Sequence, residues 1–419
     1  MRWRIALVLT VLVCNSYQTS NSDDWPMFQH DPQHTGFSTS HMPSYLQKEW
    51  EYYLGKDLDS RAYAVSMIVT KQTLIMTQNW EIYAFDLDGN LLWEFIDERP
   101  DFTYPAATKN NIYAGNYDSI LSVDLQGEKS WKVQYEYSHF TSSTLIFDDS
   151  FVIGPVGMLI DCFGPNCKEW EENMWRGQRR LVCLDIETGD LKWEFYVGSS
   201  WRGILSAYLD GKVYVRGGSS EFYCLDAETG DLIWRKGTRE LMTSNISIDE
   251  DYFYVGTYSD GVYCHDRMNG DVVWNYECDG YIYMTPALGY ENIFFGTDGG
   301  AFYCLDRNTG EKKWDLQTGE KILSHVIIAD ERVLFGTQEG NLYMLDAFSG
   351  KILSSYALGG SGISSLILSH GKIFVGEYNG RVTCFGEGQC TKEFPYPLLS
   401  LIILIPLLVF LFWWKMSRI

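Results

Sequence analysis

The amino-acid sequence predicts an all-β protein, an eight-bladed β-propeller of four-stranded antiparallel blades that is closed by an N-terminal strand and followed by one C-terminal transmembrane helix. Three observations support this fold class. A hairpin motif recurs about every 40 residues, each repeat holds four short strand-like runs, and a lone strand-like run lies near the N-terminus. A fixed period indicates an array of one supersecondary unit, and four strands per period without a helix are typical of a propeller blade.

The recurring motif joins the third and fourth strands of each repeat. Its clearest copy, CLDAETGDLIW, begins at Cys224, and three related copies begin at positions 183, 264 and 304. An aspartate opens the turn, a glycine follows four residues later, and a tryptophan follows eight residues after the aspartate. The positions concerned are Asp185, Gly189, Trp193, Asp226, Gly230, Trp234, Asp266, Gly270, Trp274, Asp306, Gly310 and Trp314.

Each residue of the motif has a structural explanation. The aspartate can accept hydrogen bonds from backbone N–H groups of its own turn, and the glycine supplies the positive φ that the hairpin needs. The tryptophan is large and flat, so it can fill the gap between neighbouring blades. Shorter copies surround Asp86 and Asp124, and a copy at Asp346 lacks the tryptophan. Because seven such turns around a ring cannot form one axial site, the motif predicts blade docking rather than catalysis.

Counting the repeats predicts a closed ring. Third strands recur near positions 82, 120, 181, 222, 262, 302, 342 and 382, which makes eight blades. The last third strand has no fourth strand after it, whereas the run at 49–55 has no three strands before it. We expect 49–55 to pair with residues 382–385 and to complete the eighth blade, which also removes the open sheet edges.

Five cysteines occupy one position of the repeat, namely Cys183, Cys224, Cys264, Cys304 and Cys384. In an eight-bladed ring the third strands of neighbouring blades lie roughly 10 Å or more apart, whereas a disulfide needs Cα atoms within about 7 Å. We therefore expect five buried free thiols that pack as small apolar side chains.

The insertion at 154–178 lengthens one repeat between its second and third strands. It contains Cys162 and Cys167, which predict a local disulfide if the protein is exported. The insertion shares a face with the connections between blades, so a lid, a partner contact and a decorative loop are all open interpretations.

Both ends of the chain indicate export and membrane attachment. Residues 1–22 combine a basic start with a short apolar run, as a secretory signal does. The propeller is expected over 23–390 and the anchor over 391–419, whose uncharged run 398–414 is long enough, at about 26 Å, to span a membrane. Basic residues follow that run, which predicts a cytoplasmic C-terminus and a propeller on the extracellular side.

The composition limits the range of partners. The formal net charge is −22, and such a surface repels phosphate backbones, so we expect no nucleic acid. Aromatic residues make up 16% of the chain, which favours a folded protein over a disordered one.

At the motif residues the sequence resembles the quinoprotein (PQQ-type) β-propeller repeat family. Thr188, Thr229 and Thr309 match the threonine of that repeat, and the lead-in at 24–38 is similar to the segment that opens such proteins. The resemblance covers about residues 24–386 and implies the propeller fold, with each tryptophan docked between blades. It does not fix the activity, because the family includes both quinone-dependent dehydrogenases and a non-catalytic propeller lipoprotein of the outer-membrane barrel assembly machinery.

The motif content favours the non-catalytic branch of this family. Enzymes of the family use a disulfide between adjacent cysteines, a Ca²⁺ ion and often a CxxCH haem segment, and this sequence has neither a Cys-Cys pair nor CxxCH. We therefore expect no catalytic residues, no cofactor and no metal. The alternative is a PQQ-dependent oxidoreductase with quinone and Ca²⁺ on the axis. The C-terminal tail is also similar to archaeal sorting tails at Glu393-Phe394-Pro395, and a processed tail would be replaced by a lipid.

Aromatic residues at the turns predict a binding face. Turns that converge on the axis of a propeller are the usual place for a ligand, here an envelope protein, a peptide or another surface ligand. The alternative is that several of these side chains only pack the tops of the blades. The candidate residues on this face are Trp80, Tyr117, Trp175, Trp201, Arg202, Tyr258 and Tyr378. The expected function is a membrane-anchored scaffold or binding module at the cell surface.

Overall fold

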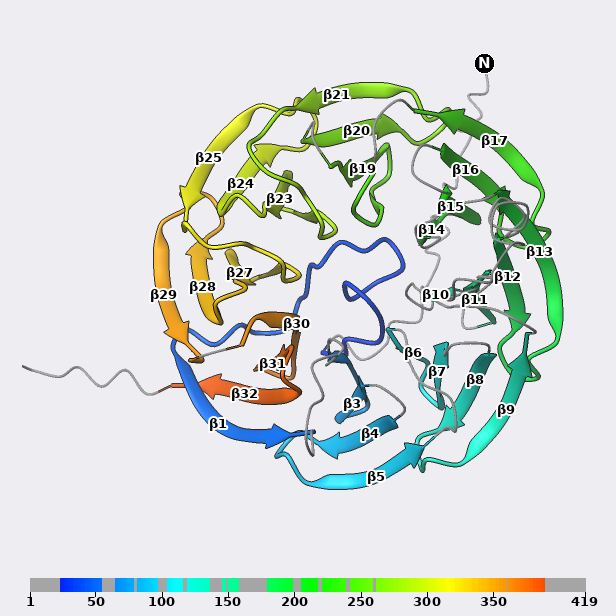
Figure 1. Cartoon of the computed structure of the whole chain (residues 1–419), viewed down its shortest axis with the longest axis horizontal. Coiled ribbons are helices and arrows are strands. Elements are labelled where there is room, and N and C mark those ends of the chain that lie inside the picture. The colour runs from blue at the N-terminus through cyan, green and yellow to red at the C-terminus, as the bar shows by residue number, and fades with distance from the viewer. Residues whose placement is uncertain are drawn as a thin grey trace, which may run out of the picture.

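The protein was analysed as a computed structural model. The structure describes residues 23–54, 65–78, 81–96, 104–115, 119–135, 145–147, 150–157, 179–198, 205–217, 221–238, 242–258, 261–359 and 361–388. In these ranges 32 strands form eight four-stranded antiparallel sheets around a ring (Figure 1), which confirms the predicted all-β propeller. The predicted signal at 1–22, the disulfide of Cys162 and Cys167, and the anchor at 391–419 lie outside the described residues.

The strands of each blade follow the chain from the centre of the ring to its rim. The first four blades are β2 (Ser66–Thr70), β3 (Thr73–Gln78), β4 (Glu81–Asp86) and β5 (Leu91–Ile96); β6 (Ala106–Ala107), β7 (Asn111–Gly115), β8 (Ser119–Asp124) and β9 (Lys129–Gln134); β10 (Leu145–Phe147), β11 (Phe151–Gly157), β12 (Arg179–Asp185) and β13 (Leu191–Gly198); and β14 (Leu205–Leu209), β15 (Lys212–Gly217), β16 (Glu221–Asp226) and β17 (Leu232–Gly237).

The second half of the ring repeats this order and ends with the strand supplied by the N-terminus. Its blades are β18 (Ser247–Ile248), β19 (Tyr252–Gly256), β20 (Val262–Asp266) and β21 (Val272–Tyr276); β22 (Ala287–Gly289), β23 (Asn292–Gly296), β24 (Ala301–Asp306) and β25 (Lys312–Gln317); β26 (Ile327–Ala329), β27 (Arg332–Gly336), β28 (Asn341–Asp346) and β29 (Ile352–Ala357); and β30 (Ile363–Ser369), β31 (Lys372–Glu377), β32 (Arg381–Glu387) and β1 (Leu46–Tyr53).

No helix among the described residues is long and apolar enough to cross a membrane.

The core lies between the blades. The three inner strands of a blade are mostly buried, whereas the outer strand alternates exposed and half-buried residues, as β25 does. Buried side chains from neighbouring blades meet face to face, and the rings of Phe302 in β24 and Phe335 in β27 stack with centroids 4.0 Å apart. Burial of these apolar faces provides most of the stabilisation that holds one blade against the next.

The two faces of the ring carry different turns. On one face, which we call the motif face, hairpins join the first strand to the second and the third to the fourth, as at Asp306–Gly310. On the other face, which we call the connection face, turns join the second strand to the third, as at Thr297–Gly300, and segments such as 277–286 lead to the next blade. This division follows from the antiparallel order of four strands.

The turn of the motif has the predicted geometry. Oδ1 of Asp185 accepts hydrogen bonds from the backbone N–H groups of Glu187 at 3.1 Å and Thr188 at 3.0 Å, and Gly189 has a φ of 77°. An ion pair with Lys192 and these backbone bonds lower the pKa of Asp185 to about 2. The carboxylate therefore stays charged, and it accepts the backbone hydrogen bonds of its own turn as predicted.

The motif tryptophan docks on the turn of the next blade, which confirms its predicted role. The Trp193 side chain is 7% exposed, and its Nε1 donates a hydrogen bond to the carbonyl of Ala227 at 2.9 Å. Its ring lies flat against Gly230, where an added Cβ would sit 2.7 Å from the indole. The same bond to the next blade is made by Trp50, Trp93, Trp131, Trp274 and Trp314.

The closing pair explains why one repeat lacks the tryptophan. Ser354 of β29 pairs with Met344 just as Trp314 pairs with Cys304, so the serine occupies the tryptophan position. In the next blade the third and fourth strands, β32 and β1, come from opposite ends of the chain, and no turn connects them. A tryptophan at position 354 would therefore have no motif turn on which to dock.

Pairing of β1 with β32 closes the ring as predicted. The antiparallel register runs from Leu46 opposite Glu387 to Tyr53 opposite Arg381, so the pair is longer than the four residues expected from the sequence. An ion pair between Glu49 of β1 and Lys372 of β31 adds a contact across the same sheet.

The five repeat cysteines are buried free thiols, as predicted. Burial raises the pKa of Cys183, Cys304 and Cys384 to about 12, which keeps these thiols protonated and unreactive. Cys278 is also free and is half-buried.

We predict that Trp193→Ala lowers the free energy of unfolding by about 3–5 kcal/mol, because it removes a buried indole and its hydrogen bond. The matched control, Ser354→Ala, should change it by less than about 0.5 kcal/mol, since this position docks on no turn. Urea denaturation followed by circular dichroism measures both. Equal effects of the two substitutions would contradict the docking role.

Candidate functional site

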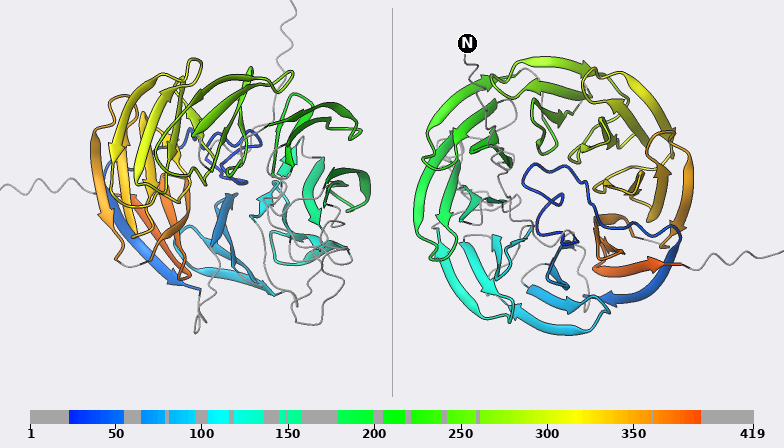
Figure 2. Two further views of the ribbon diagram at one scale, coloured as in Figure 1. Left: turned by 45° about the horizontal axis from the view of Figure 1, so that its top comes forward. Right: turned by 180° about the vertical axis from the view of Figure 1, so that it is seen from behind.

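The segment before β1 contains the predicted lead-in at 24–38. We call residues 23–44 the lead-in from here on, and they cross the middle of the ring (Figures 1 and 2). The innermost strand of each blade is an edge strand, so the backbone groups that point toward the axis need partners. The lead-in supplies them in six blades through the pairs Trp25 with Val69, Pro26 with Ala107, Pro32 with Tyr208, Gln33 with Ile248, Thr35 with Leu288, and Gly36 and Ser38 with Ile328. In the eighth blade, the Ser369 hydroxyl donates a hydrogen bond to the carbonyl of Asp23. The lead-in is therefore a built-in part of the ring.

Phe28 of the lead-in fills the axis with an aromatic cluster. Its ring makes edge-to-face contacts with His34 at 5.1 Å, Tyr104 at 4.9 Å and His325 at 4.8 Å between centroids. Tyr104 and His325 precede β6 and β26, which belong to the second and seventh blades. Side chains from the second and seventh blades thus meet those of the lead-in near the axis.

Both histidines of this axial cluster are neutral near neutral pH. Nδ1 of His34 lies 2.9 Å from the carbonyl of Ile246, and since a carbonyl can only accept, Nδ1 carries the proton. Burial lowers the pKa of His34 to about 4 and, together with the nearby His34, that of His325 to about 4. Burial also raises the pKa of the Tyr104 hydroxyl. The axis is consequently lined by uncharged aromatic groups.

On the connection face, three tyrosines gather between the fifth and sixth blades. Tyr258 lies in the turn after β19, and Tyr281 and Tyr283 lie in the segment from β21 to β22. The rings of Tyr258 and Tyr281 stack with centroids 4.1 Å apart and an interplanar angle of 14°. Oδ1 of Asp298 accepts a hydrogen bond from the backbone N–H of Tyr281 at 2.7 Å, which ties this segment to the turn of the sixth blade. We call these three residues the tyrosine corner.

Only two of the predicted face residues lie among the described residues. Tyr258 belongs to the tyrosine corner, whereas Tyr378 follows β31 in the eighth blade, where its backbone N–H donates to the Gly362 carbonyl at 2.9 Å. Tyr378 is half-buried, and burial raises the pKa of its hydroxyl, as for a packing residue. The structure does not bring the two together, because they stand three blades apart. The other candidates, which lie outside the described residues, are Trp80, Tyr117, Trp175, Trp201 and Arg202.

The sequence analysis missed Tyr281 and Tyr283. A signal was present, because the segment Tyr281-Ile282-Tyr283 corresponds to Lys321-Ile322-Leu323 one repeat later. Only the isoleucine, which is buried in both copies, is shared. Comparison of the variable positions between repeats would have found the two tyrosines.

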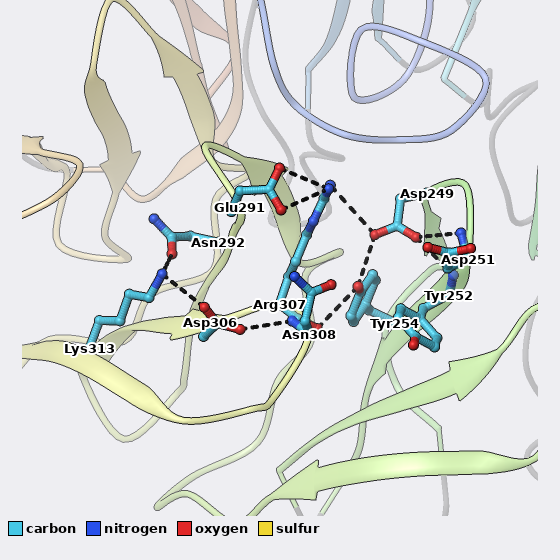
Figure 3. A network of polar contacts seen from close by, with 10 residues as sticks. All are labelled: Asp249, Asp251, Tyr252, Tyr254, Glu291, Asn292, Asp306, Arg307, Asn308 and Lys313. Carbon is cyan, nitrogen blue, oxygen red and sulfur yellow. Dashed lines mark hydrogen bonds and ion pairs between the residues drawn. The ribbon is translucent and has the colours of Figure 1, made fainter.

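Charged side chains on the motif face hold neighbouring blades together (Figure 3). Arg307 of the sixth blade reaches back to Asp249 of the fifth at 3.6 Å and also pairs with Glu291 at 3.1 Å. The Tyr254 hydroxyl donates to Asp249 at 2.9 Å, and Lys313 pairs with Asp306 at 3.1 Å. The ion pair of Arg307 with Asp249 crosses the blade boundary, whereas the other contacts lie within the fifth or the sixth blade, so the network has a structural role. Within the described ranges, no group of three or more histidine, cysteine, aspartate or glutamate side chains is placed to hold a metal ion.

Comparison with known proteins identifies the family. A family model described as PQQ_2, outer membrane protein assembly factor BamB, matches residues 177–246 and 239–392. The chain belongs to this family. The PQQ-type resemblance expected from the motif residues is thereby confirmed. No curated protein matches the chain.

Solved structures of the same fold include a BamB protein and quinoprotein-type dehydrogenases. BamB from Moraxella catarrhalis is 17% identical, with a TM-score of 0.64 over 82% of this chain and 100% of its own. A quinohemoprotein alcohol dehydrogenase from Comamonas testosteroni is 14% identical, with a TM-score of 0.69 over 88% of this chain and 82% of its own. A europium-containing methanol dehydrogenase is 13% identical, with a TM-score of 0.65 over 86% and 91%. At such identities the likeness shows the fold alone.

The axial cluster predicts a pH dependence of stability. The pKa values of His34 and His325 fall from 6.5 to about 4 on folding, so between these limits the unfolded chain binds more protons than the folded one. The contribution of these two histidines to the free energy of unfolding is therefore fully present above pH 6.5. It is lost as the pH falls toward 4, by roughly 3 kcal/mol per histidine.

We expect His325→Phe, which keeps an aromatic ring beside Phe28, to remove about half of the loss that these two histidines cause between pH 7.5 and pH 5. Urea midpoints at the two pH values measure it. An unchanged pH dependence in the variant would show that His325 does not titrate as a buried neutral group.

Proposed function

We propose that the protein is a non-catalytic scaffold that binds an envelope or surface protein or peptide on its connection face. The observation that carries this proposal is the asymmetry of the ring. The lead-in bonds to the inner strands near the motif face and Phe28 fills the axis, while the connection face presents the tyrosine corner, in which Tyr283 is 36% exposed. A binding surface of this kind needs no axial cofactor.

Family membership supports the same proposal. The family model carries the description outer membrane protein assembly factor BamB, and the structure of BamB from Moraxella catarrhalis aligns with this chain over its whole length. A scaffold role in assembling or holding envelope proteins is the function we carry over to this chain. The dehydrogenases of the same fold keep a second candidate in place, a PQQ-dependent oxidoreductase with quinone and Ca²⁺ on the axis.

We further propose that the propeller is exported and tethered to the cell membrane. The apolar start at 1–22 and the uncharged run 398–414 with basic residues after it support a signal, a single span and a cytoplasmic C-terminus. In an oxidising compartment Cys162 and Cys167 would form a disulfide. A processed sorting tail would give the same placement through a lipid.

Blocking each face in turn tests the scaffold proposal. Gln338 is exposed on the connection face and Met268 on the motif face, so Gln338→Cys and Met268→Cys each offer an attachment point for a polyethylene glycol maleimide. We expect the modified Gln338→Cys protein to lose partners that the unmodified protein retains from envelope extracts, and the modified Met268→Cys protein to retain them. Loss on the motif face alone would contradict the proposal.

Titration of the full-length protein in detergent with pyrroloquinoline quinone and Ca²⁺ tests the oxidoreductase alternative. The axial cluster of Phe28, Tyr104 and His325 predicts no saturable heat at high micromolar quinone. Saturable heat together with quinone-dependent dye reduction would favour the enzyme instead. Phe28→Ala serves as a control, because opening the axis should not create activity in a scaffold.

A further inference from the structure

The tyrosine corner presents two aromatic faces at a right angle. The ring of Tyr283 stands at 88° to that of Tyr258 and at 90° to that of Tyr281, with centroids 6.3 Å and 6.1 Å away. Tyr283 is thus in edge-to-face contact with the stacked pair of Tyr258 and Tyr281. The Tyr283 side chain is 36% exposed, and Tyr281 is half-buried, so aromatic surface is accessible to a partner here.

The propeller fold does not require these tyrosines. One repeat later, Tyr258 corresponds to Asp298, Tyr281 to Lys321 and Tyr283 to Leu323. The backbone is nevertheless the same in both copies, because Ile282 and Ile322 donate equivalent hydrogen bonds to the carbonyls of Thr257 and Thr297.

The same turn is thus built twice with unrelated side chains. Three tyrosines at one boundary between blades are an addition to the repeat, which points to a role outside folding.

Carboxylates lie beside the tyrosine corner and favour a cation. Asp298 bonds to the backbone of Tyr281, and Asp279, two residues earlier, is exposed. Burial, Tyr258 and then Asp298 raise the pKa of Tyr283, so the ring remains neutral and keeps an electron-rich face. The protein as a whole carries a formal net charge of −22. Aromatic faces next to acidic groups attract ammonium and guanidinium ions.

We propose that the tyrosine corner binds a lysine or arginine side chain of the partner, an inference that rests on the scaffold function proposed above. Tyr281 and Tyr283 contact the cation through their ring faces, and Asp279 and Asp298 balance its charge. A partly exposed aromatic surface covers one side of a ligand only, whereas sites for free small molecules bury most of their ligand. This geometry therefore suits a side chain that the rest of a protein partner holds in place.

A peptide titration tests the assignment with the full-length protein in detergent. The probe is a fluorescein-labelled Gly/Ser octapeptide that carries two lysines and two arginines, read by fluorescence anisotropy. Its match has norleucine for lysine and citrulline for arginine, so only the charge is lost. We expect the neutral peptide to bind at least about tenfold more weakly, since the cation–π and ionic contacts disappear.

Variants borrowed from the neighbouring repeats keep the fold intact. Tyr283→Leu introduces the leucine found one repeat later at Leu323, and Tyr258→Gln introduces the glutamine found two repeats later at Gln338. Each should weaken binding of the basic peptide about three- to tenfold. The matched control is Tyr196→Leu, a 51% exposed tyrosine on the outer strand β13, which should leave binding unchanged.

Three results would overturn the inference. The neutral peptide could bind as well as the basic one, which would indicate apolar contact. Both corner variants could bind the basic peptide as the unchanged protein does. Tetramethylammonium chloride could displace the peptide with an affinity equal to that of the peptide, which would identify a free small cation as the ligand. If the blocked Gln338→Cys protein still loses its partners in any of these cases, the scaffold proposal stands and only the cation site fails.

Discussion

The antiparallel pairing of β1 with β32 is the interaction on which the rest of the structure depends. Without it the eighth blade would end on an open strand edge, and the ring would have a gap between its last and first blades. β1 also closes that gap with a side chain, because Trp50 packs on Gly89 of the first blade and bonds to the carbonyl of Leu87. The same closure accounts for Ser354, which occupies the tryptophan position of the seventh blade. The eighth blade has no motif turn on which a tryptophan there could dock.

The stretch that closes the rim also occupies the axis, and this makes the two faces unequal. Residues 23–44 bond to inner strands of most blades, and the motif face is further tied together by the Asp turns and by Arg307. The connection face keeps tyrosines that the repeat itself does not use. An acidic propeller with one face held by structural contacts and one aromatic face beside carboxylates suits the proposed scaffold role, in which it would hold a basic segment of a protein partner.

The roles of repeated residues could be predicted from the sequence, because the same residue types recur at the same spacing in each repeat. Asp185, Gly189 and Trp193 have turn and docking roles that follow from side-chain type and spacing, and the ring closure follows from counting strands. The axial cluster could not be predicted in this way. Phe28 and His325 are about 300 residues apart in the sequence and meet only once the ring is closed. The tyrosine corner lies between these cases, since only a comparison of the positions that differ between repeats reveals it.

Hydrogen–deuterium exchange of the full-length protein, read peptide by peptide by mass spectrometry, tests most directly whether the stretch 23–54 is an integral part of the ring. The account predicts that peptides from the lead-in and from β1 exchange as slowly as peptides from the buried strand β24, because all of them open only with the ring. Exchange of 23–54 within seconds while β24 stays protected would show a free N-terminal arm, and it would contradict both the closure and the filled axis.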